Sequence, residues 1–154
     1  MSNMRKAGKI IAAIFASICI VASLITVIVA IFAKVVQEDP EKFKAEIQEM
    51  VASSPESNRA QTEEGMKKVA DYMLNLNHGK VLSQGVVGAI LSIVILVTVL
   101  INLPSMPIVT PAVASIASLG GAIYCGWVIM VFMVITLIGS GLVLIANLQQ
   151  DKAQ

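Results

Sequence analysis

The chain has 154 residues, of which 56% are hydrophobic and 14% are charged, and its mean hydropathy is +0.82. A soluble domain usually carries about 25% charged residues, whereas the 70 residues from Val81 to Gln150 contain no Lys, Arg, Asp or Glu at all. Such a stretch cannot cover the surface of a water-soluble protein, so the composition excludes a soluble globular domain and predicts an integral membrane protein. The balance of 11 basic and 10 acidic residues also argues against nucleic acid as a partner.

The first predicted elements are a short basic arm, residues 1–9, and a transmembrane helix, residues 10–33. The arm contains Arg5, Lys6 and Lys9 and no acidic residue. As a helix, the apolar run that follows would extend about 36 Å, enough to cross a hydrocarbon core of about 30 Å. It is too long for a typical signal peptide, so we expect an uncleaved span. Cytoplasmic segments beside spans are rich in Lys and Arg, which predicts a cytoplasmic N-terminus.

Residues 34–80 are the polar part of the chain, with seven basic and nine acidic residues, and are predicted to form an extracytoplasmic cap. Asp39-Pro40 indicates a helix start, because Asp caps free amides and Pro fits the first turn. Thr62, followed by two glutamates, indicates a second start. Gly79 is expected to end that second helix in a left-handed cap. The segment is therefore predicted to be a hairpin of two amphipathic helices.

Apolar residues recur at helical spacing in both cap helices and define a candidate contact face. Its residues are Phe43, Ile47, Met50, Met66, Val69, Met73 and Leu76. Two interpretations remain open. The two faces pack on each other and on the ends of the spans, or they form a docking surface for a partner or for the lipid interface. Methionine suits both, because it is adaptable at contacts and is also an ordinary core residue.

Three further transmembrane helices are predicted after the cap, at residues 81–103, 108–124 and 127–148. Pro104 and Pro107 indicate the turn after the first of them. The next 41 apolar residues are too long for one span, so Tyr124-Cys125-Gly126-Trp127 is expected to divide them, with the aromatic residues at the interface. A re-entrant segment at 108–124 is the alternative. Residues 149–154 form a cytoplasmic tail if there are four spans.

The predicted fold is therefore all-α: a polytopic membrane four-helix bundle with an extracytoplasmic amphipathic helical hairpin between helices 1 and 2. Small residues support close helix packing in it, since they allow backbones to approach one another in lipid. The third span carries two adjacent rows of such residues, Ala114, Ser118, Ala122 and Gly126 in one row and Ala117 and Gly121 in the other. These rows are predicted to serve either packing within one bundle or an oligomer interface.

Candidate catalytic and ligand-binding groups are scarce. The segments predicted to cross the membrane contain no carboxylate, lysine or arginine, the groups that usually mark proton relays and ion coupling. His78 is the single histidine and is expected to be a capping or solvated residue. Cys19 and Cys125 are far apart in sequence and lack metal-ligand spacing. We therefore expect no enzyme, no cofactor and no metal site.

The layout of basic arm, span, acidic helical loop and three closely spaced spans resembles that of small bacterial four-span membrane proteins of unknown function. The helix start at Asp39-Pro40-Glu41 is the most specific local element of this resemblance. It implies a bacterial plasma-membrane protein but no functional residues. The leading hypothesis is a non-enzymatic protein that acts through assembly, as an accessory, scaffold or immunity-type subunit. Its expected partners are membrane lipid and either further copies of itself or another membrane protein. The alternative is an oligomeric pore-forming protein or passive channel, for example a holin-like one.

Overall fold

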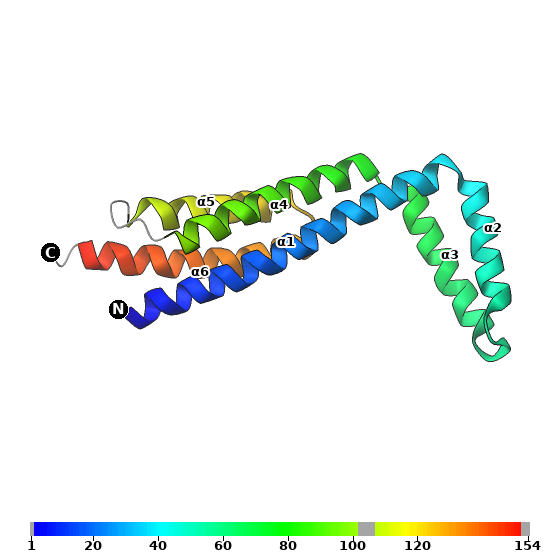
Figure 1. The fold of residues 1–154 in the computed structure, drawn as a ribbon, viewed down its shortest axis with the longest axis horizontal. Coiled ribbons are helices and arrows are strands. Elements are labelled where there is room, and N and C mark those ends of the chain that lie inside the picture. The colour runs from blue at the N-terminus through cyan, green and yellow to red at the C-terminus, as the bar shows by residue number, and fades with distance from the viewer. Residues whose placement is uncertain (1, 102–106, 152–154) are drawn as a thin grey trace. The chain divides into compact units, whose positions relative to one another are not determined.

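The computed structural model describes residues 2–101 and 107–151 of the chain. Over these ranges the chain forms six α-helices, one short 3-10 helix and no strand, which confirms the all-α fold class (Figure 1). The elements in chain order are α1 (Ser2–Glu38), α2 (Pro40–Ser53), η1 (Glu56–Asn58), α3 (Arg59–Asn75), α4 (His78–Leu100), α5 (Val109–Tyr124) and α6 (Trp127–Asp151). They divide into two compact units, and α1 contributes to both.

The first unit comprises Met1–Val27 and Ser83–Gln154. One buried cluster at its centre takes side chains from the first part of α1 and from α4, α5 and α6. Most of these side chains are small or medium-sized, and the cluster consists of Ala12, Ala16, Cys19, Ile95, Val99, Ala114, Ala117, Cys125, Ile129 and Met133. Because the residues are small, the helix backbones lie close together, as is common for helices that pack in lipid.

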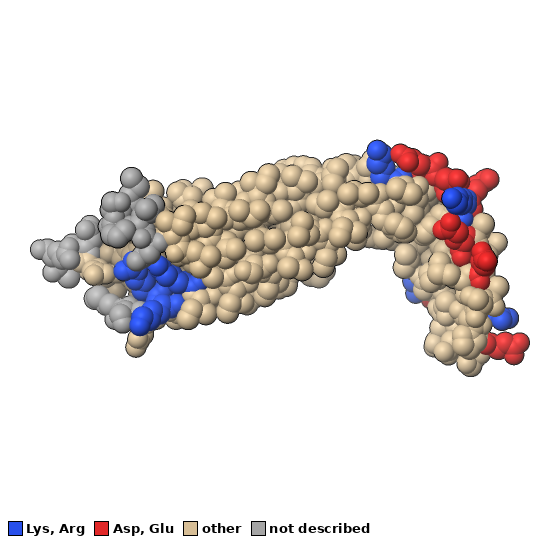
Figure 2. All heavy atoms as spheres, in the orientation of Figure 1, with Lys and Arg blue, Asp and Glu red and all other residues tan. Residues whose placement is uncertain are grey.

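Within the described ranges, three helices are long and apolar enough to cross a membrane, which is consistent with the composition of the chain. They are α1, α4 and α6, whereas α5 is a shorter apolar helix of 16 residues. In the first unit the face seen in Figure 2 is uncharged along the helices, and Lys and Arg side chains gather near the N-terminus of α1. Large apolar side chains such as Ile116 and Ile123 are mostly exposed, as expected for a surface that contacts lipid.

Three buried hydroxyl groups in this unit are satisfied within their own helices, whereas Ser23 Oγ has no hydrogen-bond partner among the described residues. Ser92 Oγ donates to Gly88 O at 2.7 Å, Ser118 Oγ to Ala114 O at 2.7 Å and Thr136 Oγ1 to Phe132 O at 2.8 Å. The core of a membrane holds no water that could accept these hydrogen bonds. Hydrogen bonds from the hydroxyls to carbonyls of their own helices therefore allow Ser and Thr within apolar spans.

The division between α5 and α6 is the predicted one. α5 ends at Tyr124, and α6 begins at Trp127. The turn is held to the start of α4, since Ser83 Oγ lies 2.7 Å from Tyr124 Oη and Gln84 Nε2 donates to Tyr124 O at 3.1 Å. Most of the turn predicted around Pro104 lies outside the described residues.

The second unit, Ile28–Leu82, contains the end of α1, the helices α2 and α3, and the first residues of α4. The predicted start of α2 is confirmed, because the Asp39 side chain accepts a hydrogen bond from Lys42 N and Pro40 occupies the first turn. Ile47, Val51 and Ala70 form a small buried core between α2 and α3, so these helices are a hairpin.

Two predicted boundaries in this unit are wrong. α3 begins at Arg59 and not after Thr62, because the η1 turn ends at Asn58 and runs directly into the helix. Gly79 is not a left-handed cap, since no described residue has a positive φ and Gly79 lies in the first turn of α4. The chain instead leaves α3 through Leu76 in an extended conformation.

Candidate functional site

The small-residue rows of α5 lie against the rest of the first unit. Ala114 and Ser118 are fully buried, Ala117 and Gly121 are also buried, and the last two positions, Ala122 and Gly126, are half-buried. Much of this packing is against α6: Ser115 Oγ on the same helix donates to Ser140 Oγ at 3.0 Å. The small residues of α5 therefore pack against other helices of the same chain in this structure.

Two glycines show how close the backbones of α1 and α6 come. A Cβ atom added to Gly8 would lie 2.7 Å from Gly139 O, and one added to Gly139 would lie 2.8 Å from Ala12 N. Gly141, one position beyond Ser140 in α6, has no atom within 4 Å of an added Cβ. The α1–α6 contact thus requires glycine at two positions, and Gly141 is not part of it.

The residues of the candidate contact face of the hairpin differ in their burial. Ile47 is buried in the hairpin core, and Phe43 and Met66 pack against that core. Met50 and Val69 each keep 46% of their surface exposed, and the remaining two members of the face, Met73 and Leu76, are half-buried. Phe43 also meets Phe32 of α1 edge to face, with ring centroids 6.0 Å apart. The predicted face is thus partly internal packing and partly open surface.

A groove of about 580 Å³ runs along the hairpin, between α2 and α3. Ile47, Val51 and Ala70 contribute apolar side chains to it. Its polar and charged lining residues are Lys44, Gln48, Arg59, Glu63, Lys67 and Asp71. An apolar floor between charged walls is the kind of surface on which a helix docks. This groove is not predicted from the sequence, because helical periodicity assigns the apolar residues of each helix to a single face.

Two ion pairs on α3 join residues one helical turn apart. Lys67 Nζ lies 2.7 Å from Glu63 Oε1, and Lys68 Nζ lies 2.7 Å from Glu64 Oε1. The hydrogen bond to Lys67 and its positive charge lower the pKa of Glu63, and the same hydrogen bond and the carboxylate charge raise the pKa of Lys67. Arg59 Nη2 donates to Ala52 O at 3.2 Å and so covers a carbonyl at the end of α2.

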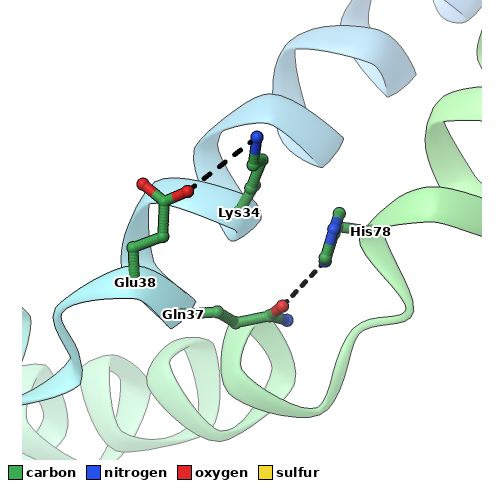
Figure 3. Close-up of polar contacts among 4 residues, drawn as sticks. All are labelled: Lys34, Gln37, Glu38 and His78. Atoms are coloured by element: carbon green, nitrogen blue, oxygen red, sulfur yellow. Dashed lines mark hydrogen bonds and ion pairs between the residues drawn. The ribbon is translucent and has the colours of Figure 1, made fainter.

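Gln37 joins the end of α1 to the end of α3 and also contacts His78 at the start of α4, the contact that Figure 3 shows. Its side-chain amide Nε2 donates to Met73 O in the last turn of α3 at 2.9 Å and to Leu76 O just after the helix at 2.7 Å. The last carbonyls of a helix have no partner within it, so Gln37 caps the end of α3. The amide oxygen therefore faces His78, whose Nδ1 is 2.8 Å away. Because an amide oxygen only accepts, His78 must carry its proton on Nδ1 and donate it. The role of Gln37 is not predicted from the sequence. Its one sign there is a single amide side chain among apolar and charged neighbours.

Cys19 and Cys125 are both buried free thiols in the first unit. Among the described residues, no group of three His, Cys, Asp or Glu side chains is placed to hold a metal ion. His78 is half-buried and hydrogen-bonded to Gln37, in the first turn of α4. This contact links α4 to the end of α1.

No known protein family, no curated protein and no solved structure matches the chain. The three long apolar helices are compatible with a small membrane protein, which is the coarse part of the resemblance noted above.

Proposed function

We propose that the chain is a non-enzymatic integral membrane protein that acts through assembly, with the α2–α3 hairpin as its contact surface. The observation that carries this proposal is the open groove along the hairpin, with its apolar floor and charged walls. Two helices bury only one side of each other, and here the shared core contains three buried side chains among the described residues. A further helix laid over the groove would cover its apolar floor and meet its charged walls.

The proposed membrane arrangement has four spans, formed by α1, α4, α5 and α6. α5 would extend about 24 Å, somewhat less than the hydrocarbon core, and its packing on α6 supports a span rather than a surface helix. The basic residues at the start of α1 favour a cytoplasmic N-terminus and an extracytoplasmic hairpin. The layout favours a bacterial plasma membrane.

Topology is tested by labelling of single introduced cysteines in intact bacterial cells. A membrane-impermeant maleimide should label Ser54→Cys at the tip of the hairpin and leave Gln149→Cys in the tail unlabelled until the cells are opened. The opposite pattern would reverse the proposed orientation. Labelling of both positions from outside would favour three full spans. In that case only two spans separate the hairpin from the tail, so both lie on the same side of the membrane.

Assembly is tested by cross-linking in native membranes and by sedimentation of the purified chain in mild detergent. The proposal expects a complex of defined mass above that of the 16.3 kDa monomer. Gln48→Trp would fill the groove and should weaken the complex, whereas Gln61→Trp, on exposed surface outside the groove, should not. A strictly monomeric chain would contradict the proposal. Dye leakage from liposomes that contain only this chain would favour the alternative, a passive pore.

A further inference from the structure

The α3 wall of the groove carries charges of alternating sign. Arg59, Glu63, Lys67 and Asp71 line the groove one helical turn apart, in the order positive, negative, positive, negative. Residues four apart lie on one face of a helix, so the four side chains form a single row about 18 Å long. Arg59 and Asp71, at its two ends, make no ion pair with the part of the chain that the structure describes.

When the direction of this row is reversed, each positive charge takes the place of a negative charge and each negative charge that of a positive one. If two α3 helices lie antiparallel about a two-fold axis at the level of Gly65, Arg59 of each copy faces Asp71 of the other. Glu63 of each copy then faces Lys67 of the other. The same operation places Ala60, which is exposed, opposite Ala70, a small residue on the floor of the groove. A two-fold contact uses the same patch on both copies, so it requires this kind of self-complementarity.

We infer that a second copy of this chain occupies the groove, with its α3 antiparallel to the first; this inference rests on the proposed function and names its partner. The contact contains two Arg59–Asp71 pairs and two Glu63–Lys67 pairs around the alanines. The neighbouring row on α3 carries only two opposite charges, those of Glu64 and Lys68. The distance between them is 2.7 Å, equal to the distance between Glu63 and Lys67. Charge complementarity therefore selects the groove side of the helix.

The pairing is expected to be weak in isolation and effective in a membrane. The overlap covers 13 residues of α3, from Arg59 to Asp71, and exposed ion pairs each contribute little in water. Two copies inserted in the same bilayer are already confined to a thin layer, which raises their effective concentration. The contact thus determines which surfaces meet when copies encounter each other.

The experiment uses complementary charge reversals in the full-length chain, with donor- and acceptor-labelled copies in liposomes and energy transfer as the readout. Glu63→Lys places two lysines opposite each other across the axis, and Lys67→Glu does the same with two glutamates. Each variant alone should associate at least about tenfold more weakly than the wild type, because two attractive pairs become repulsive. A mixture of the two variants restores both attractive pairs and should associate as the wild type does.

Glu64→Lys and Lys68→Glu are the matched controls, because they break an equivalent ion pair on the same helix but outside the groove. The inference expects both controls to associate as the wild type does. It is overturned if the Glu63 and Lys67 variants self-associate normally, if their mixture is not restored, or if the controls are equally impaired. If the Glu63 and Lys67 variants self-associate normally, the complex still forms, and the proposed function stands without this contact. A wild-type chain that shows no association in any membrane would contradict both.

Discussion

The contact between α1 and α6 offers a sharp test of the packing, because Gly139 and Gly141 lie in the same helix with different surroundings. In Gly139→Ala, the new methyl group would lie 2.8 Å from Ala12 N, about 0.6 Å closer than ordinary van der Waals contact begins. Its neighbour here is backbone, which cannot rotate away, so α1 and α6 must separate. Overpacking of this kind typically costs about 1–3 kcal/mol.

Gly141→Ala is the matched control, since an added methyl group at Gly141 meets no atom within 4 Å. Both substitutions change helix propensity by a similar amount, about 1 kcal/mol in favour of Ala, so the difference between them isolates the clash. We expect Gly139→Ala to be less stable than Gly141→Ala by about 1–3 kcal/mol. The free energy of unfolding would be measured by SDS titration in mild detergent, followed by circular dichroism. Equal stability of the two variants would refute the close α1–α6 contact.

Three further predictions follow from the hairpin and from the buried thiols. The Glu63–Lys67 pair should stabilise α3 above pH 4.5, the ordinary pKa of Glu63, and this contribution should be lost as the pH falls through the lowered pKa. Thermal unfolding of the full chain between pH 7 and pH 3 should show this loss, and the loss should be smaller in Lys67→Ala. Gln37→Leu should destabilise the hairpin by about 1–3 kcal/mol, because two carbonyls of α3 and the Nδ1–H of His78 lose their partner; hydrogen exchange at the end of α3 should accelerate, and unchanged exchange would contradict the role of the amide. Cys19 and Cys125 should resist maleimide in the folded protein and react after SDS denaturation, whereas rapid labelling of the folded chain would contradict their burial.

Local chemistry in the sequence was sufficient to predict several helix boundaries. Asp39 and Pro40 predict the start of α2 because a carboxylate that caps an amide and a ring that fits the first turn act within four residues. The break between Tyr124 and Trp127 was also predicted, since an apolar run of twice the bilayer thickness must reverse. The start of α3 was missed because η1 leads into it, and no side-chain cap marks Asn58.

The composition of the chain by itself determined that the protein is helical and membrane-like, because 70 uncharged residues can satisfy their backbone in lipid only within helices or a closed barrel. Only the tertiary structure decided what the small residues and the charges contact. Periodicity shows that Ala114 and Ser118 share a face, but not that this face meets the same chain. Likewise, the alternating row from Arg59 to Asp71 is visible in the sequence, but its position beside an apolar groove depends on how α2 packs on α3. The physical reason is that a pattern defines a face, whereas a contact requires a second surface that is distant in sequence.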